Sequence, residues 1–126
     1  FLDETADNID QVMKEYADQK PYIAEVTPAV GSTVMADALP SEVVVRFSEP
    51  MSMNGYGMNW IQRHGIEHIP IEGSLRWQDE YTLVIPLDTA ALEPGKTYGA
   101  NLLGWAFRSQ KGFPISGYYE VYFTVR

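Results

Sequence analysis

The sequence predicts an all-β fold, an antiparallel β-sandwich of about seven strands preceded by one N-terminal α-helix. Three observations lead to this fold class. Beyond Tyr22, apolar residues alternate with polar ones in several short runs, which is the period of a half-buried strand. Turn signals such as Asn54-Gly55 and Pro94-Gly95 separate these runs at intervals of 8 to 15 residues. In the first 20 residues, by contrast, apolar side chains recur every three or four positions.

The composition is typical of one globular domain. The chain has 126 residues, of which 45% are hydrophobic and 21% charged. Its formal net charge of −8 would repel a phosphate backbone, so we expect no nucleic-acid partner. The chain has no cysteine, which excludes disulfides and thiolate metal sites. No apolar run approaches the roughly 20 residues of a membrane span, no signal peptide is visible, and the start at Phe1 suggests a piece of a longer protein.

Residues 1–20 are predicted to form the helix. Its apolar stripe consists of Leu2, Ala6, Ile9, Met13 and Tyr16. Pro21 ends the helix, because proline disfavours helical geometry at Lys20 and has no amide hydrogen to donate. The segment holds six acidic and two basic residues, and so carries half of the net charge. Two interpretations stay open: the helix packs on its own domain, or it is the last helix of a preceding domain, followed by a short linker.

Residues 21–126 are predicted to form the sandwich. The strands expected from the alternation lie at residues 22–27, 31–34, 42–48, 81–87, 97–103 and 118–125. In the third of these runs, Val43, Val45 and Phe47 share one face. We expect one face of each sheet to meet the other sheet and the second face to meet water.

Three segments and the final strand together resemble a known family. "VTPAVGSTV", "EVVVRFSEPM", "LEPGKTY" and the final "YEVYFTVR" are similar to the bacterial Ig-like domains of the surface-layer (SbsA Ig-like) type, over residues 22–126. The resemblance implies an Ig-like sandwich in which the Tyr98 hydroxyl bonds back to the turn at Pro94-Gly95. Segments 51–72 and 104–117 depart from the commonest members, and resemble better the members that follow catalytic domains in exported proteins.

The stretch "HGIEH", residues 64–68, matches the H-x-x-E-H pattern of inverted zinc peptidases. In those enzymes one helical turn stacks both histidines on one face. Here Gly65 and Pro70 disfavour a helix. In a strand, His64 and His68 would lie about 13 Å apart, too far to share a zinc ion. The sequence therefore favours a hairpin loop with two exposed histidines, and a metal-dependent hydrolase is a remote alternative.

Aromatic side chains gather in the predicted loops. The contact surface that we expect consists of Tyr56, Trp60, Trp105, Phe107, Arg108 and Phe113. Trp105 is expected to be an exposed, partner-facing ring, whereas Trp60 and Trp77 are expected to pack in the core or against another domain. The same rings could instead stack on sugars, with an amide such as that of Asn101 holding the hydroxyls.

Catalytic and metal-binding patterns are weak in this sequence. Glu49, Asp79 and Glu80 lie at predicted turns but lack the alternating spacing of a calcium loop. No nucleophile elbow, phosphate-binding loop or catalytic triad is present. We therefore predict no catalytic residue, no metal site, no cofactor and no enzymatic activity.

Together these features predict a non-catalytic Ig-like accessory module of a larger exported bacterial protein. It would space or dock a neighbouring domain of the same polypeptide through protein–protein contacts. The alternative is a carbohydrate-binding module that holds a polysaccharide on its loop aromatics. The family resemblance implies a periplasmic, extracellular or cell-surface location.

Overall fold

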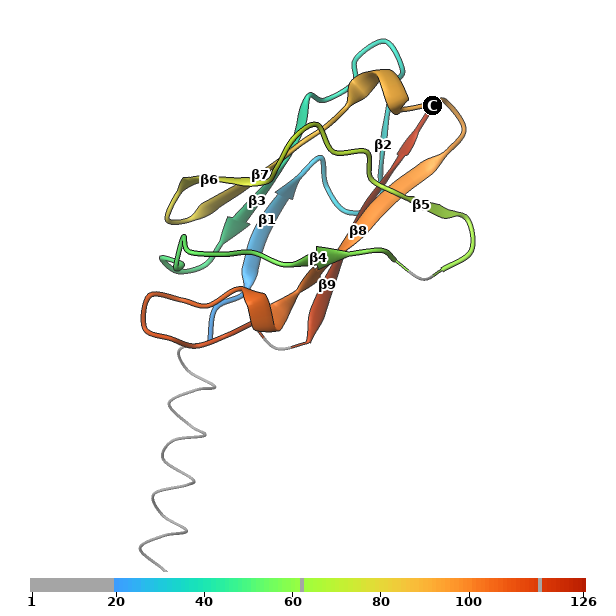
Figure 1. Cartoon of the computed structure of the whole chain (residues 1–126). Helices are drawn as coiled ribbons and strands as arrows, with labels where there is room; N and C mark the ends of the chain where they lie inside the picture. The colour runs from blue at the N-terminus through green and yellow to red at the C-terminus, as the bar shows by residue number, and fades with distance from the viewer. Residues whose placement is uncertain (1–19, 62, 116) are drawn as a thin grey trace, which may run out of the picture.

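A computed structural model describes residues 20–61, 63–115 and 117–126 of the chain (Figure 1). These residues form two β-sheets packed into a sandwich, which confirms the all-β fold class predicted from the alternation. The helix predicted for residues 1–20 lies, apart from Lys20, outside the described residues. In the described part of the chain, no helix is long and apolar enough to cross a membrane.

The first sheet has the strand order β1-β3-β7-β6. Its strands are β1 (Ile23–Thr27), β3 (Glu42–Phe47), β7 (Thr82–Pro86) and β6 (Arg76–Asp79). The second sheet has the order β2-β9-β8-β4, and β5 also pairs with β8. Its strands are β2 (Ser32–Val34), β9 (Tyr118–Val125), β8 (Thr97–Leu103), β4 (Met58–Asn59) and β5 (Ile66–His68). Two short 3₁₀-helices, η1 (Thr89–Ala91) and η2 (Gly104–Ala106), flank β8.

The strand count and the strand directions differ from the prediction. The described residues form nine strands rather than about seven. Strands β4 and β5, with two and three residues, show no readable alternation, and β6 lies outside the expected runs as well. The sandwich is also not purely antiparallel. Strand β2 runs parallel to β9, and β5 runs parallel to β8. Parallel pairs need long crossovers, so neighbouring runs in the sequence do not reveal them.

Inward-facing residues of both sheets form the core. Val43, Val45 and Phe47 of β3 are buried, while Arg46 points away and is exposed, as the alternation predicts. Strand β7 departs from alternation, because all four residues from Thr82 to Ile85 are buried. It lies between β3 and β6 in the middle of its sheet, which shields its backbone on both sides.

Three aromatic rings pack together at one end of the core. The Phe47 ring lies 5.4 Å from Trp77 and 5.6 Å from Phe107, measured between ring centroids. The Trp77 indole N–H donates a 3.1 Å hydrogen bond to the carbonyl oxygen of Gly55. This end of the sandwich therefore anchors the loop that precedes β4.

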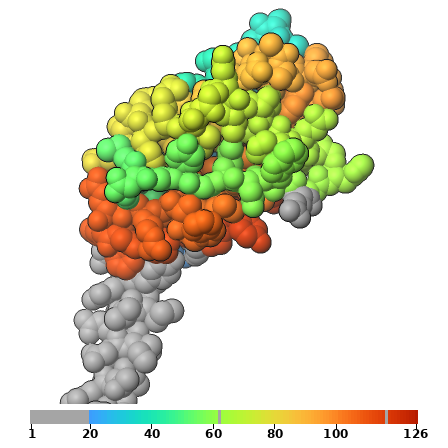
Figure 2. Space-filling view, in the orientation of Figure 1, coloured from blue at the N-terminus to red at the C-terminus, as the bar shows by residue number. Residues whose placement is uncertain are grey.

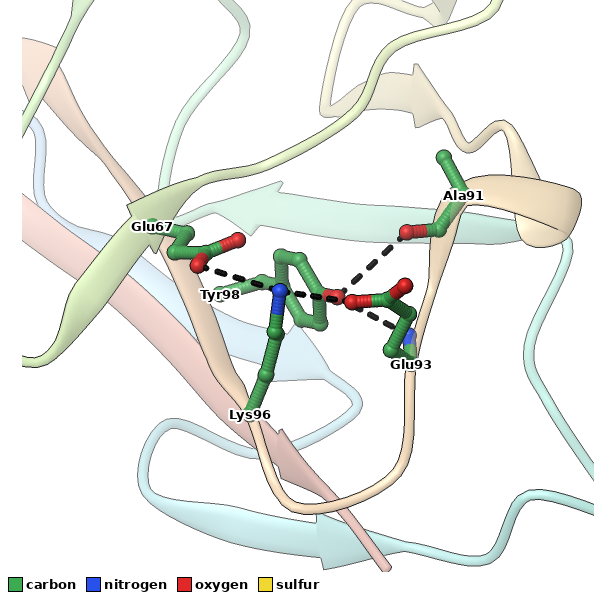
Figure 3. Close-up of polar contacts among 5 residues, drawn as sticks. All are labelled: Glu67, Ala91, Glu93, Lys96 and Tyr98. Atoms are coloured by element: carbon green, nitrogen blue, oxygen red, sulfur yellow. Dashed lines mark hydrogen bonds and ion pairs between the residues drawn. The ribbon is translucent and has the colours of Figure 1, made fainter.

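Tyr98 fixes the turn that leads into β8 (Figure 3). Its hydroxyl accepts a 2.8 Å hydrogen bond from the Glu93 backbone N–H and donates a 3.3 Å hydrogen bond to the Ala91 carbonyl oxygen. The predicted return of this hydroxyl to turn backbone is confirmed, and the ring itself is 3% exposed. The interaction satisfies two backbone groups beside a buried ring.

Lys96 connects this turn to β5. Its ammonium lies 2.6 Å from a Glu93 carboxylate oxygen and 3.4 Å from Glu67 (Figure 3). The hydrogen bond to Lys96 lowers the pKa of Glu93, and the same bond raises the pKa of Lys96. All three side chains are substantially exposed, so we expect this network to orient the turn more than to stabilise the fold.

Candidate functional site

A groove with a volume of about 350 Å³ lies against the outer face of the second sheet. It is lined by Asn59, Trp60, Ile61, Arg63, Asn101, Tyr118 and Glu120. The register of the strands brings together the polar residues on the floor of the groove, because Asn101 of β8 lies opposite Glu120 of β9. Their neighbours Ala100 and Val121 point into the core, so both polar side chains must point outward.

Polar contacts shape the floor of the groove. The Asn101 side-chain N–H donates a 3.2 Å hydrogen bond to the Trp60 carbonyl oxygen. The Asn101 Oδ1 atom is buried and has no hydrogen-bond partner among the described residues. Arg63 forms a 2.7 Å ion pair with Glu120 and lies over the Tyr122 ring, 5.6 Å from its centroid. The positive charge of Arg63 is thus already engaged.

Two exposed aromatic side chains flank the floor. Trp60 is 64% exposed and Tyr118 is 72% exposed. Of the two places expected for Trp60, the core is therefore wrong, because β4 is the edge strand of its sheet and leaves the following residue at the surface. That Trp60 packs against another domain stays a prediction. One face of the Trp60 ring is stacked on His68. Trp77, by contrast, packs against Phe47 and Phe107, as predicted for a core residue.

The HGIEH stretch forms no helical turn. Gly65 has a φ of 89°, and Ile66–His68 forms β5. His64 is exposed as predicted, but His68 is only partly exposed, and burial lowers the pKa of His68. No three His, Cys, Asp or Glu side chains gather at a metal-binding distance among the residues that the structure describes. The geometry therefore does not support the hydrolase hypothesis.

The predicted contact surface is divided by the fold. Trp105 is 68% exposed and Tyr56 is 43% exposed. Arg108 is exposed and donates a 3.3 Å hydrogen bond to the Gly112 carbonyl oxygen, while Phe113 is half-buried. Phe107 does not belong to a surface, because it is 1% exposed and packs in the core. That the exposed members bind a partner stays a prediction.

Two of the three carboxylates at the turns, those of Asp79 and Glu80, have local structural partners. Asp79 accepts a 2.8 Å hydrogen bond from the Tyr81 backbone N–H, and this bond lowers the pKa of Asp79. Glu80 accepts a 3.0 Å hydrogen bond from the Gln110 side chain. Glu49 has a buried carboxylate oxygen without a hydrogen-bond partner in the described residues. These contacts support turn geometry rather than a calcium site.

Segment 51–58 contains three methionines that sequence reasoning did not single out. The Met53 side chain is 53% exposed, Met51 is fully buried, and Met58 is partly buried against the core. Three thioethers within eight residues are the signal that could have drawn attention to this segment. Thioether sulfur is a soft ligand, which suits copper(I).

The methionine segment lies along the connection between β8 and β9. The Ser52 backbone N–H donates a 2.8 Å hydrogen bond to the Arg108 carbonyl oxygen, and the Leu103 N–H donates a 3.0 Å bond to the Gly57 carbonyl oxygen. In Figure 2 the green segment before β4 runs beside the orange segment that follows β8. Backbone hydrogen bonds therefore hold the segment at the sandwich surface.

The fold is that of a two-sheet β-sandwich. No protein-family model and no curated protein matches the sequence. The crystal structure of PcoC, a methionine-rich copper resistance protein from Escherichia coli, is similar to this chain with a TM-score of 0.58 and 20% sequence identity. The match covers 86% of this chain and 100% of that protein. At this identity the likeness establishes the fold.

This comparison contradicts the function expected from the sequence. The expected function was that of a non-catalytic Ig-like accessory module that spaces or docks a neighbouring domain. The protein that shares the fold across its whole length is instead a copper resistance protein. The carbohydrate-binding and hydrolase alternatives gain no support from it either.

Proposed function

We propose that this protein handles copper, taking up copper(I) through the exposed thioether of Met53. The observation that carries the proposal is the pairing of two features. The chain shares its fold with a methionine-rich copper resistance protein, and it presents a methionine-dense segment at its surface. The proposal includes no catalytic step.

The donor chemistry of the chain favours a soft ion over a hard one. The chain has no cysteine, and its described part holds no cluster of three His, Cys, Asp or Glu side chains. Zinc and calcium sites need such clusters of nitrogen, thiolate or oxygen ligands. Thioethers are the soft donors that the chain offers, and they select copper(I).

The two largely exposed methionines of the described residues, Met35 and Met53, do not lie together. Met35 follows β2 and is 53% exposed, and its neighbour Ala36 donates a hydrogen bond to Arg126 at the end of β9. Met53 lies near Arg108, ahead of the start of β9. An eight-residue strand is about 25 Å long, so the two sulfurs belong to opposite ends of the sandwich. Met53 therefore acts as a single donor, which favours weak binding and transfer over storage.

The test is an anaerobic titration of the protein with copper(I) supplied as its acetonitrile complex, a weak competitor. We expect the unmodified protein to withdraw copper from acetonitrile, and Met53→Leu to weaken binding by about tenfold or more, equivalent to about 1.4 kcal/mol. The matched control is Met51→Leu, because that thioether is buried and the substitution keeps its volume. Failure of the unmodified protein to compete, or equal binding by both variants, would contradict the proposal.

Three further expectations from the sequence remain proposals. A periplasmic or extracellular location agrees with a copper resistance role. The kinship with surface-layer Ig-like domains is supported by the Tyr98 contact and by the two-sheet fold. The neighbouring domain and the polysaccharide that were expected as partners stay predictions, and neither is needed for copper uptake.

A further inference from the structure

We propose that the groove between Trp60 and Tyr118 binds an organic cation that carries N–H donors, such as an alkylammonium or a guanidinium group. The site is separate from the methionine segment and does not rest on the copper proposal. Its volume of about 350 Å³ lies at the lower end of the range for small-molecule pockets.

The groove presents electron-rich groups to a ligand. Trp60 and Tyr118 flank it with largely exposed rings, and aromatic faces attract cations. The back of the Trp60 ring is covered by His68, which leaves one face of the indole for a ligand. The carboxylate of Glu120 also lines the groove, where it pairs with Arg63, and a bound cation can take the place of Arg63 in this pair. Cations therefore meet favourable partners on several sides.

Asn101 explains why the cation should carry N–H groups. Its N–H is used by the Trp60 carbonyl oxygen, which fixes the orientation of the amide. The Oδ1 atom of this groove-lining residue is buried and is an acceptor without a partner in the described part of the chain. A buried acceptor left unpaired costs free energy, and a donor from the ligand removes that cost. Quaternary ammonium ions lack such a donor.

An anionic ligand fits less well. Arg63 is the one cationic side chain among the residues that line the groove, and it already pairs with Glu120 and lies over the Tyr122 ring. The chain as a whole carries a net charge of −8, which repels anions and attracts cations. A bound cation would compete with Arg63 for Glu120. Removing the charge of Arg63 should therefore strengthen binding, whereas it would abolish the binding of an anion.

The experiment is a titration of the full chain followed by the NMR signal of the Trp60 indole N–H. The probes are putrescine, for a free diamine, and N-acetyl-arginine amide, for a peptide side chain. Tetramethylammonium tests the need for N–H donors, and glucose tests a neutral ligand. We expect one or both N–H cations to bind, and tetramethylammonium to bind more weakly. Whichever of putrescine and N-acetyl-arginine amide binds more tightly shows whether the cation is a free amine or a peptide side chain.

Variants locate the ligand. We expect Trp60→Ala to weaken binding about fivefold and Glu120→Gln about tenfold. In both variants the aromatic C–H signals of the Tyr118 ring still report binding, so loss of the Trp60 indole signal does not end the measurement. Arg63→Gln should raise affinity. The matched control Trp105→Ala removes an equally exposed indole outside the groove and should leave binding unchanged. Thermal melts confirm that each variant is folded.

Several results would overturn the proposal. Binding of acetate or glucose in place of the cations would do so, as would loss of binding in Arg63→Gln. Equal effects of Trp60→Ala and Trp105→Ala would show that the cations bind unspecifically to the acidic surface. These outcomes are independent of copper(I) uptake, because Met53 does not line the groove.

Discussion

The ring of Trp60 stacks on the ring of His68, with centroids 4.6 Å apart and planes inclined by 15°. This contact joins the chain just after β4 to the last residue of β5. It holds an otherwise exposed indole in one position beside the groove. The imidazole is partly buried by the same contact, so the two rings should respond together to pH.

Lowering the pH should destabilise the fold through His68. Burial lowers the pKa of His68, so the unfolded chain takes up a proton before the folded chain does. The free energy of unfolding should therefore be unaffected by this group above neutral pH. It should fall as the pH drops below the ordinary value of about 6.5 towards the folded pKa. Urea unfolding at a series of pH values measures this.

Comparison with His68→Gln isolates that effect from the titration of the carboxylates. The variant should lose the part of the pH dependence that lies just below pH 6.5. An NMR titration of the His68 ring should give a midpoint below the same value. A midpoint at or above it would show that the Trp60 ring stabilises the imidazolium more than burial opposes it.

Tyr98→Phe should reduce the free energy of unfolding by about 1–3 kcal/mol. The substitution keeps the buried ring but leaves the Glu93 N–H and the Ala91 carbonyl oxygen without their partner. Thermal or urea unfolding measures the change. Tyr22→Phe is the matched control, because that side chain is 63% exposed and its loss of a hydroxyl should change stability by less than about 0.5 kcal/mol. Equal stability of the two variants would refute the role given to Tyr98.

Gly104→Ala should destabilise the protein by about 1–3 kcal/mol. A Cβ at this position would clash with the backbone carbonyl oxygens of Ile115 and Gly117, where the chain returns towards β9. Gly55→Ala is the control, because a Cβ there meets open space. Thermal unfolding of both variants, followed by circular dichroism, measures the change in stability. An unchanged melting midpoint in Gly104→Ala would mean that the segment between β8 and β9 moves aside without a cost in stability.

The sequence was informative wherever one face of a strand is buried. Alternation located β3, β8 and β9, and the family resemblance implied the hydrogen bonds of Tyr98 to turn backbone. The alternation did not locate β4 and β5, because a strand of two or three residues is too short to show a repeating pattern. The alternation also did not predict the parallel pairing of β2 with β9, because strands this far apart in the sequence are paired by the fold as a whole.

The candidate sites were less predictable than the fold. Phe107 lies in a segment that reads as an aromatic loop, yet it is buried because the connection folds back over Phe47. The groove depends on the register that sets Asn101 opposite Glu120, residues 19 positions apart. Met53 could have been noticed from composition alone. What composition cannot tell is that its neighbour Met51 is fully buried.

The place of β9 has a consequence for how the protein is made. This strand lies between β2 and β8, so it supplies the centre of the second sheet although it ends at Val125. During synthesis β2 and β8 emerge with no partner between them. The two layers cannot close before β9 has been synthesised, and a chain truncated before Tyr118 should not fold.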